Sequence, residues 1–93
     1  MAKKRDFDAL AATWDNNPGR ISAARGICEA VRQEGPLSDA LQARDYGCGT
    51  GLVTLGLQPD LGSIVAADSS EGMLAVLQDK LAAAQIDNVW TLR

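Results

Sequence analysis

The sequence predicts an α/β protein: a partial doubly wound parallel sheet of about three strands, preceded by two helices. Three strand-like runs, at 43–46, 63–67 and 89–92, alternate with segments whose apolar residues recur at helical spacing. The first run ends in a turn, 47–51, with glycine at every second position. Strands that alternate with helices form parallel sheets, and a glycine-rich turn between strand and helix is typical of nucleotide-binding folds.

Residues 1–36 are expected to form a helical region. Apolar residues at helical spacing predict a first helix from Asp6 to Trp14. A second helix is predicted from Pro18 to Glu34, because Asn17 is a good N-cap and proline is favoured at the first helical position. Gly35 is a suitable residue to end it.

Residues 37–93 are expected to contain the sheet and its crossovers. The chain reaches the first strand, Ala43 to Tyr46, through a connection with room for one helical turn. A helix from Gly51 to Gln58 follows the glycine turn. The second strand, Ser63 to Ala67, is a continuous apolar run of the kind that parallel sheets bury on both faces.

One helix and one strand complete the chain. The helix is predicted from Ser70 to Gln85, with one of the two preceding serines, Ser69 or Ser70, as its cap. Glu71 lies in the first turn, where the helix dipole favours an acid. Lys80 is expected on a solvated face of this helix. A third strand, Val89 to Leu92, follows a short turn.

The glycine turn separates two kinds of nucleotide site. A dinucleotide fingerprint needs glycine at the first, third and sixth positions, but the sixth position counted from Gly47 is Leu52. An acid, Asp45, also precedes the turn, where it would repel a pyrophosphate. A second acid, Asp68, ends the next strand, close to the spacing of about 20 residues at which a carboxylate meets a nucleotide ribose.

Two motifs carry a resemblance to a known family. The run Asp45-Tyr46-Gly47-Cys48-Gly49-Thr50-Gly51 resembles the acidic-x-Gly-x-Gly-x-Gly turn of Rossmann-like S-adenosylmethionine-dependent methyltransferases. The run from Val65 to Leu74 resembles the second-strand motif of the same family, in which an acid precedes a polar turn and a Gly-Met-Leu helix start. A sulfonium cation suits the acid beside the turn. The resemblance is to the N-terminal half of that domain, with 1–36 as a helical lid.

The resemblance implies S-adenosylmethionine as cofactor and assigns residues to it. Asp68 would hold the two ribose hydroxyls, Met73 would pack near the adenine, and Asp45 would lie near the amino group. The glycines would line the methionine and ribose. The cofactor-binding residues expected in this way are Asp45, Gly47, Cys48, Gly49, Gly51, Asp68, Ser69 and Met73.

Structural roles are the alternatives at several of these positions. Asp68 could cap the following helix, Met73 could belong to the core, and the turn could serve only to join a strand to a helix. Cys48 is interpreted as a small filler and not as a nucleophile. No residue is identified as catalytic, and positioning alone can supply much of the rate of an in-line displacement.

Composition narrows the function classes. The chain has no histidine and only two cysteines, Cys28 and Cys48, so no metal site is expected. A net charge of −3 argues against nucleic acid as a partner, and the basic run Lys3-Lys4-Arg5 is interpreted as a solvated tail. No apolar run approaches the about 18 residues of a membrane span, and no signal peptide is recognised. A cytoplasmic protein with a small-molecule methyl acceptor is expected.

Right-handed crossovers would leave the first strand at one edge of the sheet with unpaired backbone groups. We therefore expect either a truncated part of a longer enzyme, inactive on its own, or a chain that forms a homodimer through this edge. Three functions stay open. They are the cofactor-binding half of a small-molecule methyltransferase, a dinucleotide-binding module, and a catalytically inactive module that dimerises or binds a partner.

Overall fold

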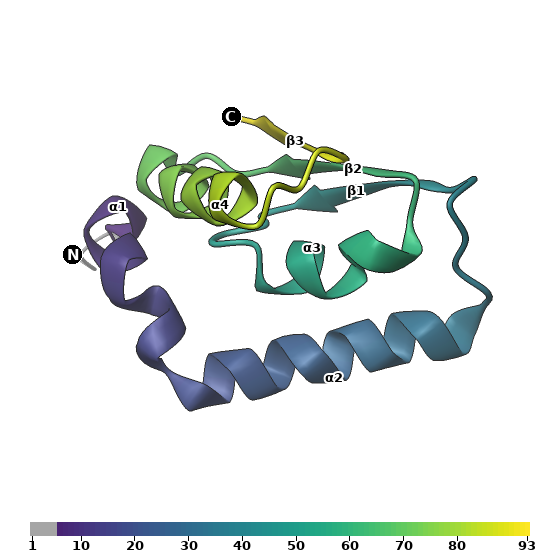
Figure 1. Ribbon diagram of the computed structural model, residues 1–93. Coiled ribbons are helices and arrows are strands. Elements are labelled where there is room, and N and C mark those ends of the chain that lie inside the picture. Colours follow the sequence, from purple (N-terminus) through teal and green to yellow (C-terminus); the bar gives the residue numbers. More distant parts are fainter. Residues whose placement is uncertain (1–5) are drawn as a thin grey trace.

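The computed structural model describes residues 6–93 and contains a three-stranded parallel sheet (Figure 1). The strands β1 (Gln42–Tyr46), β2 (Ser63–Ala67) and β3 (Val89–Leu92) lie in the order β1-β2-β3. The predicted α/β fold class is confirmed, and β1 starts one residue earlier than expected. The edge position predicted for the first strand is also confirmed. The basic run 3–5 lies outside the described residues.

The single helix expected over 6–14 is wrong. The structure has a short α-helix, α1 (Phe7–Leu10), followed by a 3₁₀ helix, η1 (Ala11–Asn16). Asp6 caps α1 by accepting a hydrogen bond from the Ala9 amide at 3.2 Å. The second half of the segment ends in Thr-Trp-Asp-Asn, and such residues favour α-helix weakly because their side chains lose rotamers or compete for backbone bonds.

The long helix α2 (Pro18–Glu34) has the predicted bounds. Its predicted cap is confirmed, because the Asn17 side chain accepts a hydrogen bond from the Gly19 amide at 2.9 Å. Only Ala24 and Cys28 of this helix are buried. The connection to β1 contains a turn and no helical segment.

Two helices link the strands. The first is α3 (Leu52–Leu57), which continues as the 3₁₀ helix η2 (Gln58–Asp60), and the second is α4 (Glu71–Ala83). Ser70 caps α4 by accepting from the Met73 amide at 3.2 Å, which selects it over Ser69. The helix ends earlier than predicted, because Gln85 takes a left-handed conformation with φ of 55° and reverses the chain.

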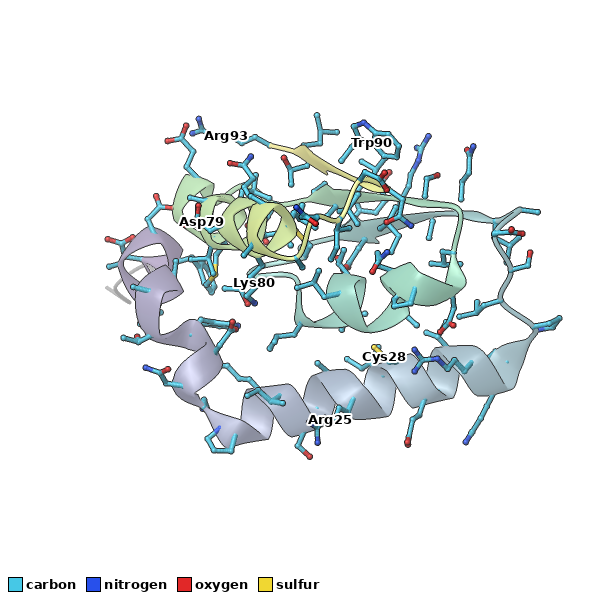
Figure 2. The ribbon with its side chains drawn as sticks, viewed as in Figure 1. Arg25, Cys28, Asp79, Lys80, Trp90 and Arg93 are labelled. Carbon is cyan, nitrogen blue, oxygen red and sulfur yellow. The ribbon has the colours of Figure 1, made fainter. Side chains whose placement is uncertain are left out.

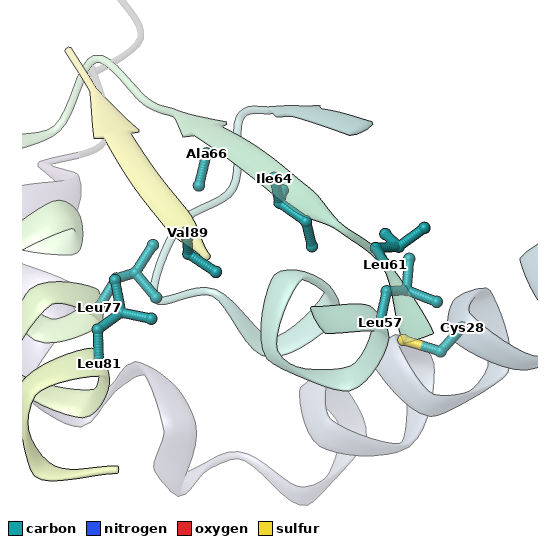
Figure 3. Packing of buried hydrophobic residues seen from close by; sticks show 8 residues of the cluster. All are labelled: Cys28, Leu57, Leu61, Ile64, Ala66, Leu77, Leu81 and Val89. Carbon is teal, nitrogen blue, oxygen red and sulfur yellow. The ribbon is translucent and has the colours of Figure 1, made fainter. Parts of the chain in front are cut away.

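All the longer helices lie on one side of the sheet (Figure 1). The core lies between these helices and the covered sheet face, and Figure 3 shows its side chains. Its buried members are Cys28, Leu57, Leu61, Ile64, Ala66, Leu77, Leu81 and Val89.

The opposite face of the sheet has no helix over it among residues 6–93 (Figure 1). The expectation that β2 is buried on both faces is therefore wrong: Ile64 and Ala66 are buried, while Val65 on the other face is only half-buried. Trp90, which points away from the helices in Figure 2, is 57% exposed, and Tyr46 is 72% exposed. We call this the open sheet face.

Within residues 6–93, none of the helices has both the length and the apolar character needed to cross a membrane. The described part of the chain also contains no cluster of side chains suited to hold a metal ion.

The packing of the core predicts how much stability is lost when the side chain of Leu77 is shortened. Leu77 is completely buried, so Leu77→Ala should lower the free energy of unfolding by about 2 to 5 kcal/mol. The exposed neighbour Asp79 provides the control, because Asp79→Ala should change it by less than about 0.5 kcal/mol. Urea unfolding followed by circular dichroism measures both, and equal midpoints for the two variants would contradict this packing.

Candidate functional site

The turn between β1 and α3 depends on its three glycines. Gly47, Gly49 and Gly51 have φ values of 71°, 57° and 86°, a left-handed region that other residues rarely adopt. Gly51 is further restricted, because a Cβ there would collide with the side chain of Leu77 on α4. The glycines thus let the backbone take a left-handed conformation at three of five positions, and Gly51 lets Leu77 of α4 pack against the turn.

Asp68 points into this turn. One of its carboxylate oxygens accepts a hydrogen bond from the Gly49 amide at 2.8 Å, and the other accepts from the Ser70 amide at 2.8 Å. An ionised carboxylate has about four acceptor positions, so each oxygen keeps one for a further donor. The structure therefore brings together the two motifs of the sequence and leaves Asp68 able to accept two more hydrogen bonds.

The amides of Gly47, Cys48, Gly49 and Gly51 do not form an open anion cradle, because each has an acceptor within the protein. Gly47 and Cys48 both donate to the Ala67 carbonyl, at 2.7 and 3.0 Å. The Gly51 amide donates to the Cys48 carbonyl at 3.0 Å. With the Gly49 amide bound to Asp68, four amides of the turn are used within the protein, and a phosphate would have to displace those bonds.

Asp45 lies on β1, two residues before Gly47. Its carboxylate accepts a hydrogen bond at 2.6 Å from the hydroxyl of Thr54, which is almost fully buried in α3. The bond fixes the acid relative to the first helix and satisfies a hydroxyl that would otherwise be costly to bury. Sequence reasoning identified Asp45 but not Thr54. The signal that could have found Thr54 is a threonine in the first turn of the helix that follows the strand of Asp45.

Asp15 of η1 connects the N-terminal segment to the turn. It accepts a hydrogen bond from the Thr50 hydroxyl at 2.6 Å and pairs with Lys80 of α4 at 2.5 Å. Lys80 also donates to the Thr50 carbonyl at 2.9 Å. The expectation that Lys80 lies on a solvated face is therefore wrong: its ammonium group lies below α4, on the side of the N-terminal segment (Figure 2).

A second acid, Asp8, fixes the same segment at another point. Its carboxylate accepts from the Ser70 hydroxyl at 2.5 Å and from the Gly72 amide at 2.7 Å, at the N-terminus of α4. An acid is stabilised there by the unpaired amides and the helix dipole. Sequence reasoning missed this contact, because nothing in the spacing of Asp8 and Ser70 brings them together.

Both acids are held ionised. The Ser70 and Gly72 hydrogen bonds lower the pKa of Asp8 below its usual 3.8. Partial burial raises the pKa of Asp15, but the Lys80 and Thr50 contacts outweigh it and the pKa is lowered overall. Because both folded-state values lie below the unfolded value, these contacts stabilise the fold above pH 3.8. That stability is lost as the pH falls through the folded-state pKa values.

The pKa of Cys48 is shifted by the surroundings of the turn. Burial, followed by the negative charges of Asp45 and Asp68, raises the pKa of its thiol to about 12. The thiol is therefore protonated at neutral pH, which supports its interpretation as a filler. Of the remaining expected residues, Met73 is buried with its sulfur close to Gly49, and Ser69 is exposed beside Asp68.

The family described as "Methyltransferase domain" matches residues 43–93, which is more than half of the chain. The chain belongs to this family. The match includes the glycine turn, Asp68, β2, β3 and all of β1 except its first residue, Gln42. The comparison with curated proteins gave no match.

Solved methyltransferase structures share the fold. A protein of Methanococcus maripaludis assigned to the S-adenosyl-L-methionine-dependent methyltransferases is 20% identical over 100% of this chain, with a TM-score of 0.75. DhpI, solved with SAH, is 25% identical over 94% of this chain, with a TM-score of 0.71. SMU.1697c of Streptococcus mutans, also solved with SAH, is 29% identical over 59%, with a TM-score of 0.57. The chain covers 44%, 40% and 31% of these proteins, respectively.

The raised pKa of Cys48 predicts that its thiol is alkylated slowly. The pKa of Cys48 is about 12, compared with 9.0 for an unperturbed thiol. At pH 7, Cys48 should therefore react with an alkylating reagent about 10³-fold more slowly in the folded protein than in the protein unfolded by urea. A Cys28→Ala background isolates this thiol, and mass spectrometry follows the modification. Asp68→Asn in that background should raise the rate, since it removes one of the two negative charges. A folded-state rate equal to that in urea would contradict the assignment.

Proposed function

We propose that this chain binds S-adenosylmethionine in the turn between β1 and α3 and forms the cofactor-binding half of a methyltransferase. The observation that carries the proposal is the position of Asp68. Its carboxylate is fixed by the Gly49 and Ser70 amides and keeps two acceptor positions, which matches the two neighbouring hydroxyls of a ribose.

The charges around the turn favour this cofactor over a dinucleotide. Asp45 and Asp68 both act on Cys48, so the turn lies in a negative potential. A sulfonium and an amino group are attracted by such a potential, whereas a pyrophosphate is repelled. The glycine amides, moreover, already have acceptors within the protein. These facts support a cationic ligand.

When bound, the cofactor supplies an activated methyl group: a lone pair of the acceptor forms the new bond to the methyl carbon, and the electrons of the broken carbon–sulfur bond pass to sulfur. The chain's own contribution is to orient this group. Asp68 would hold the ribose, Asp45 would face the amino group, and Met73 would pack near the adenine. The N-terminal segment, fixed by Asp8 and Asp15, would cover the turn as a lid.

We further propose a small molecule as the methyl acceptor. The net charge of −3 and the carboxylates at the turn are unfavourable for a nucleic acid backbone. Positioning of the acceptor in line with the sulfonium would supply much of the rate, so the mechanism does not depend on a general base within this chain.

Calorimetric titration of the chain with S-adenosylhomocysteine tests the proposal. Asp68→Asn keeps the shape of the side chain but removes its charge, and should weaken binding by at least about tenfold, because hydrogen bonds to charged groups are worth about 1.5 to 3 kcal/mol. Asp79→Asn makes the same chemical change at an exposed site and should leave the affinity unaltered. Equal affinities for both variants, or no binding by the unaltered chain, would refute the proposal.

A second candidate function, an interaction module, is favoured by the open sheet face and the free edge of β1. Tyr46, Trp90 and Leu92 expose apolar surface on this face, and β1 has only one neighbouring strand among the described residues. Exposed apolar strands of this kind tend to pair with another chain. The occupant we propose is a second copy, joined about a two-fold axis at β1.

Sedimentation velocity at micromolar concentration tests this association. We expect a dimer that dissociates when Tyr46→Lys places a charge at the edge beside Arg44. Gln33→Lys, on the exposed surface of α2, is the matched control and should leave the dimer intact. A stable monomer of the unaltered chain would exclude the homodimer.

A further inference from the structure

A cavity of about 230 Å³ lies between the N-terminal segment and the glycine turn. Its walls come from η1, α2 and α3 as well as the turn, and they include Trp14, Arg20, Ile27, Cys48 and Leu52. Cys48 and Thr50 of the turn line it directly, so a molecule in the cavity is in contact with the proposed cofactor site. A larger cavity of about 300 Å³ between α2 and α3 contains no residue of the turn.

The lining of this cavity includes one cation, Arg20, that is held by an aromatic ring. The guanidinium of Arg20 stacks on the Trp14 ring, 3.6 Å from its centroid, and donates one hydrogen bond to the Trp14 carbonyl at 3.2 Å. The side chain has five N–H donors, so most remain available. No carboxylate among residues 6–93 pairs with it. The carboxylates that form ion pairs there bind other cations: Asp15 binds Lys80, Asp60 binds Arg32 and Glu71 binds Arg93.

A half-buried cation beside an apolar cavity has the composition of a small-ligand site. Such sites combine mostly apolar walls with a few fixed polar groups that orient the ligand. Stacking on Trp14 fixes the plane of the Arg20 guanidinium, and a guanidinium held in one plane binds a carboxylate through two parallel hydrogen bonds. The apolar walls formed by Ile27, Leu52 and Val53 suit an aromatic or similarly flat hydrocarbon group.

We propose that this cavity binds the methyl acceptor and that the acceptor is a small aromatic carboxylate held by Arg20. The inference rests on the proposed function. The charges also set its orientation: Asp45 and Asp68 repel the carboxylate from the turn, while Arg20 attracts it toward α2. The other end of the acceptor then faces Cys48 and Thr50, where the sulfonium would lie. A volume of about 230 Å³ lies below the about 300 to 1,000 Å³ of pockets for drug-sized ligands, so the acceptor is a small molecule.

Benzoate is the probe, and the emission of Trp14 is the readout. A Trp90→Phe background leaves Trp14 as the only tryptophan, because the chain contains two. Benzoate should change this emission saturably, and benzyl alcohol, which lacks the charge, should bind at least about tenfold more weakly. Arg20→Gln should abolish the preference for benzoate, and Arg20→Lys, which keeps the charge without the fork, should retain part of it. Arg25→Gln, on the exposed side of α2, should have no effect.

Binding of S-adenosylhomocysteine, measured in the same variants, separates this inference from the proposed function. Loss of benzoate binding in Arg20→Gln with unaltered affinity for S-adenosylhomocysteine supports both. Benzoate binding that depends on Arg20 in a chain without affinity for S-adenosylhomocysteine would keep the anion site but refute its role as the acceptor site. Equal binding of benzoate and benzyl alcohol, or equal binding of benzoate by the unaltered chain and Arg20→Gln, would overturn the inference.

Discussion

The carboxylate of Asp68 joins the two halves of the site. It accepts one hydrogen bond from the Gly49 amide in the turn after β1 and another from the Ser70 amide at the start of α4. The ends of two neighbouring strands are therefore held at a fixed distance. Gly49 can offer its amide only because it takes a left-handed conformation, with the flanking glycines reversing the chain on either side. A single acid thus organises the turn before any ligand is bound.

The same principle fixes the N-terminal segment. Asp8 and Asp15 come from a part of the chain with short helices and few buried side chains, so apolar packing alone holds it weakly. Each acid instead reaches a polar group near the turn: Asp8 contacts Ser70 at the start of α4, and Asp15 contacts Thr50 and Lys80. The segment that walls the cavity is therefore positioned by charge, and it depends on the state of these carboxylates.

Local patterns in the sequence were enough to predict the strands, the long helix α2 and the meeting of Asp68 with the glycine turn. They could do so because glycine spacing, caps and strand length are properties of neighbouring residues. The contacts of Asp8, Asp15 and Lys80 could not be predicted, since their side chains reach residues 30 or more positions away in the sequence. The failure over 6–14 has a different origin: the Thr-Trp-Asp-Asn run that ends the segment favours α-helix only weakly, and a 3₁₀ helix forms there.

The charges of the molecule are divided across the cavity. Cys48, which lines the cavity from the turn, lies in the field of Asp45 and Asp68, which raises the pKa of its thiol, while α2 contributes the guanidinium of Arg20 to the lining. A neutral ligand would gain little from such an arrangement, but a cation at the turn and an anion against Arg20 would each be stabilised and would attract one another. A methyl group carried by a sulfonium would then lie between them. The division of charge thus gives one physical reason for both ligands to bind with their reacting ends in contact.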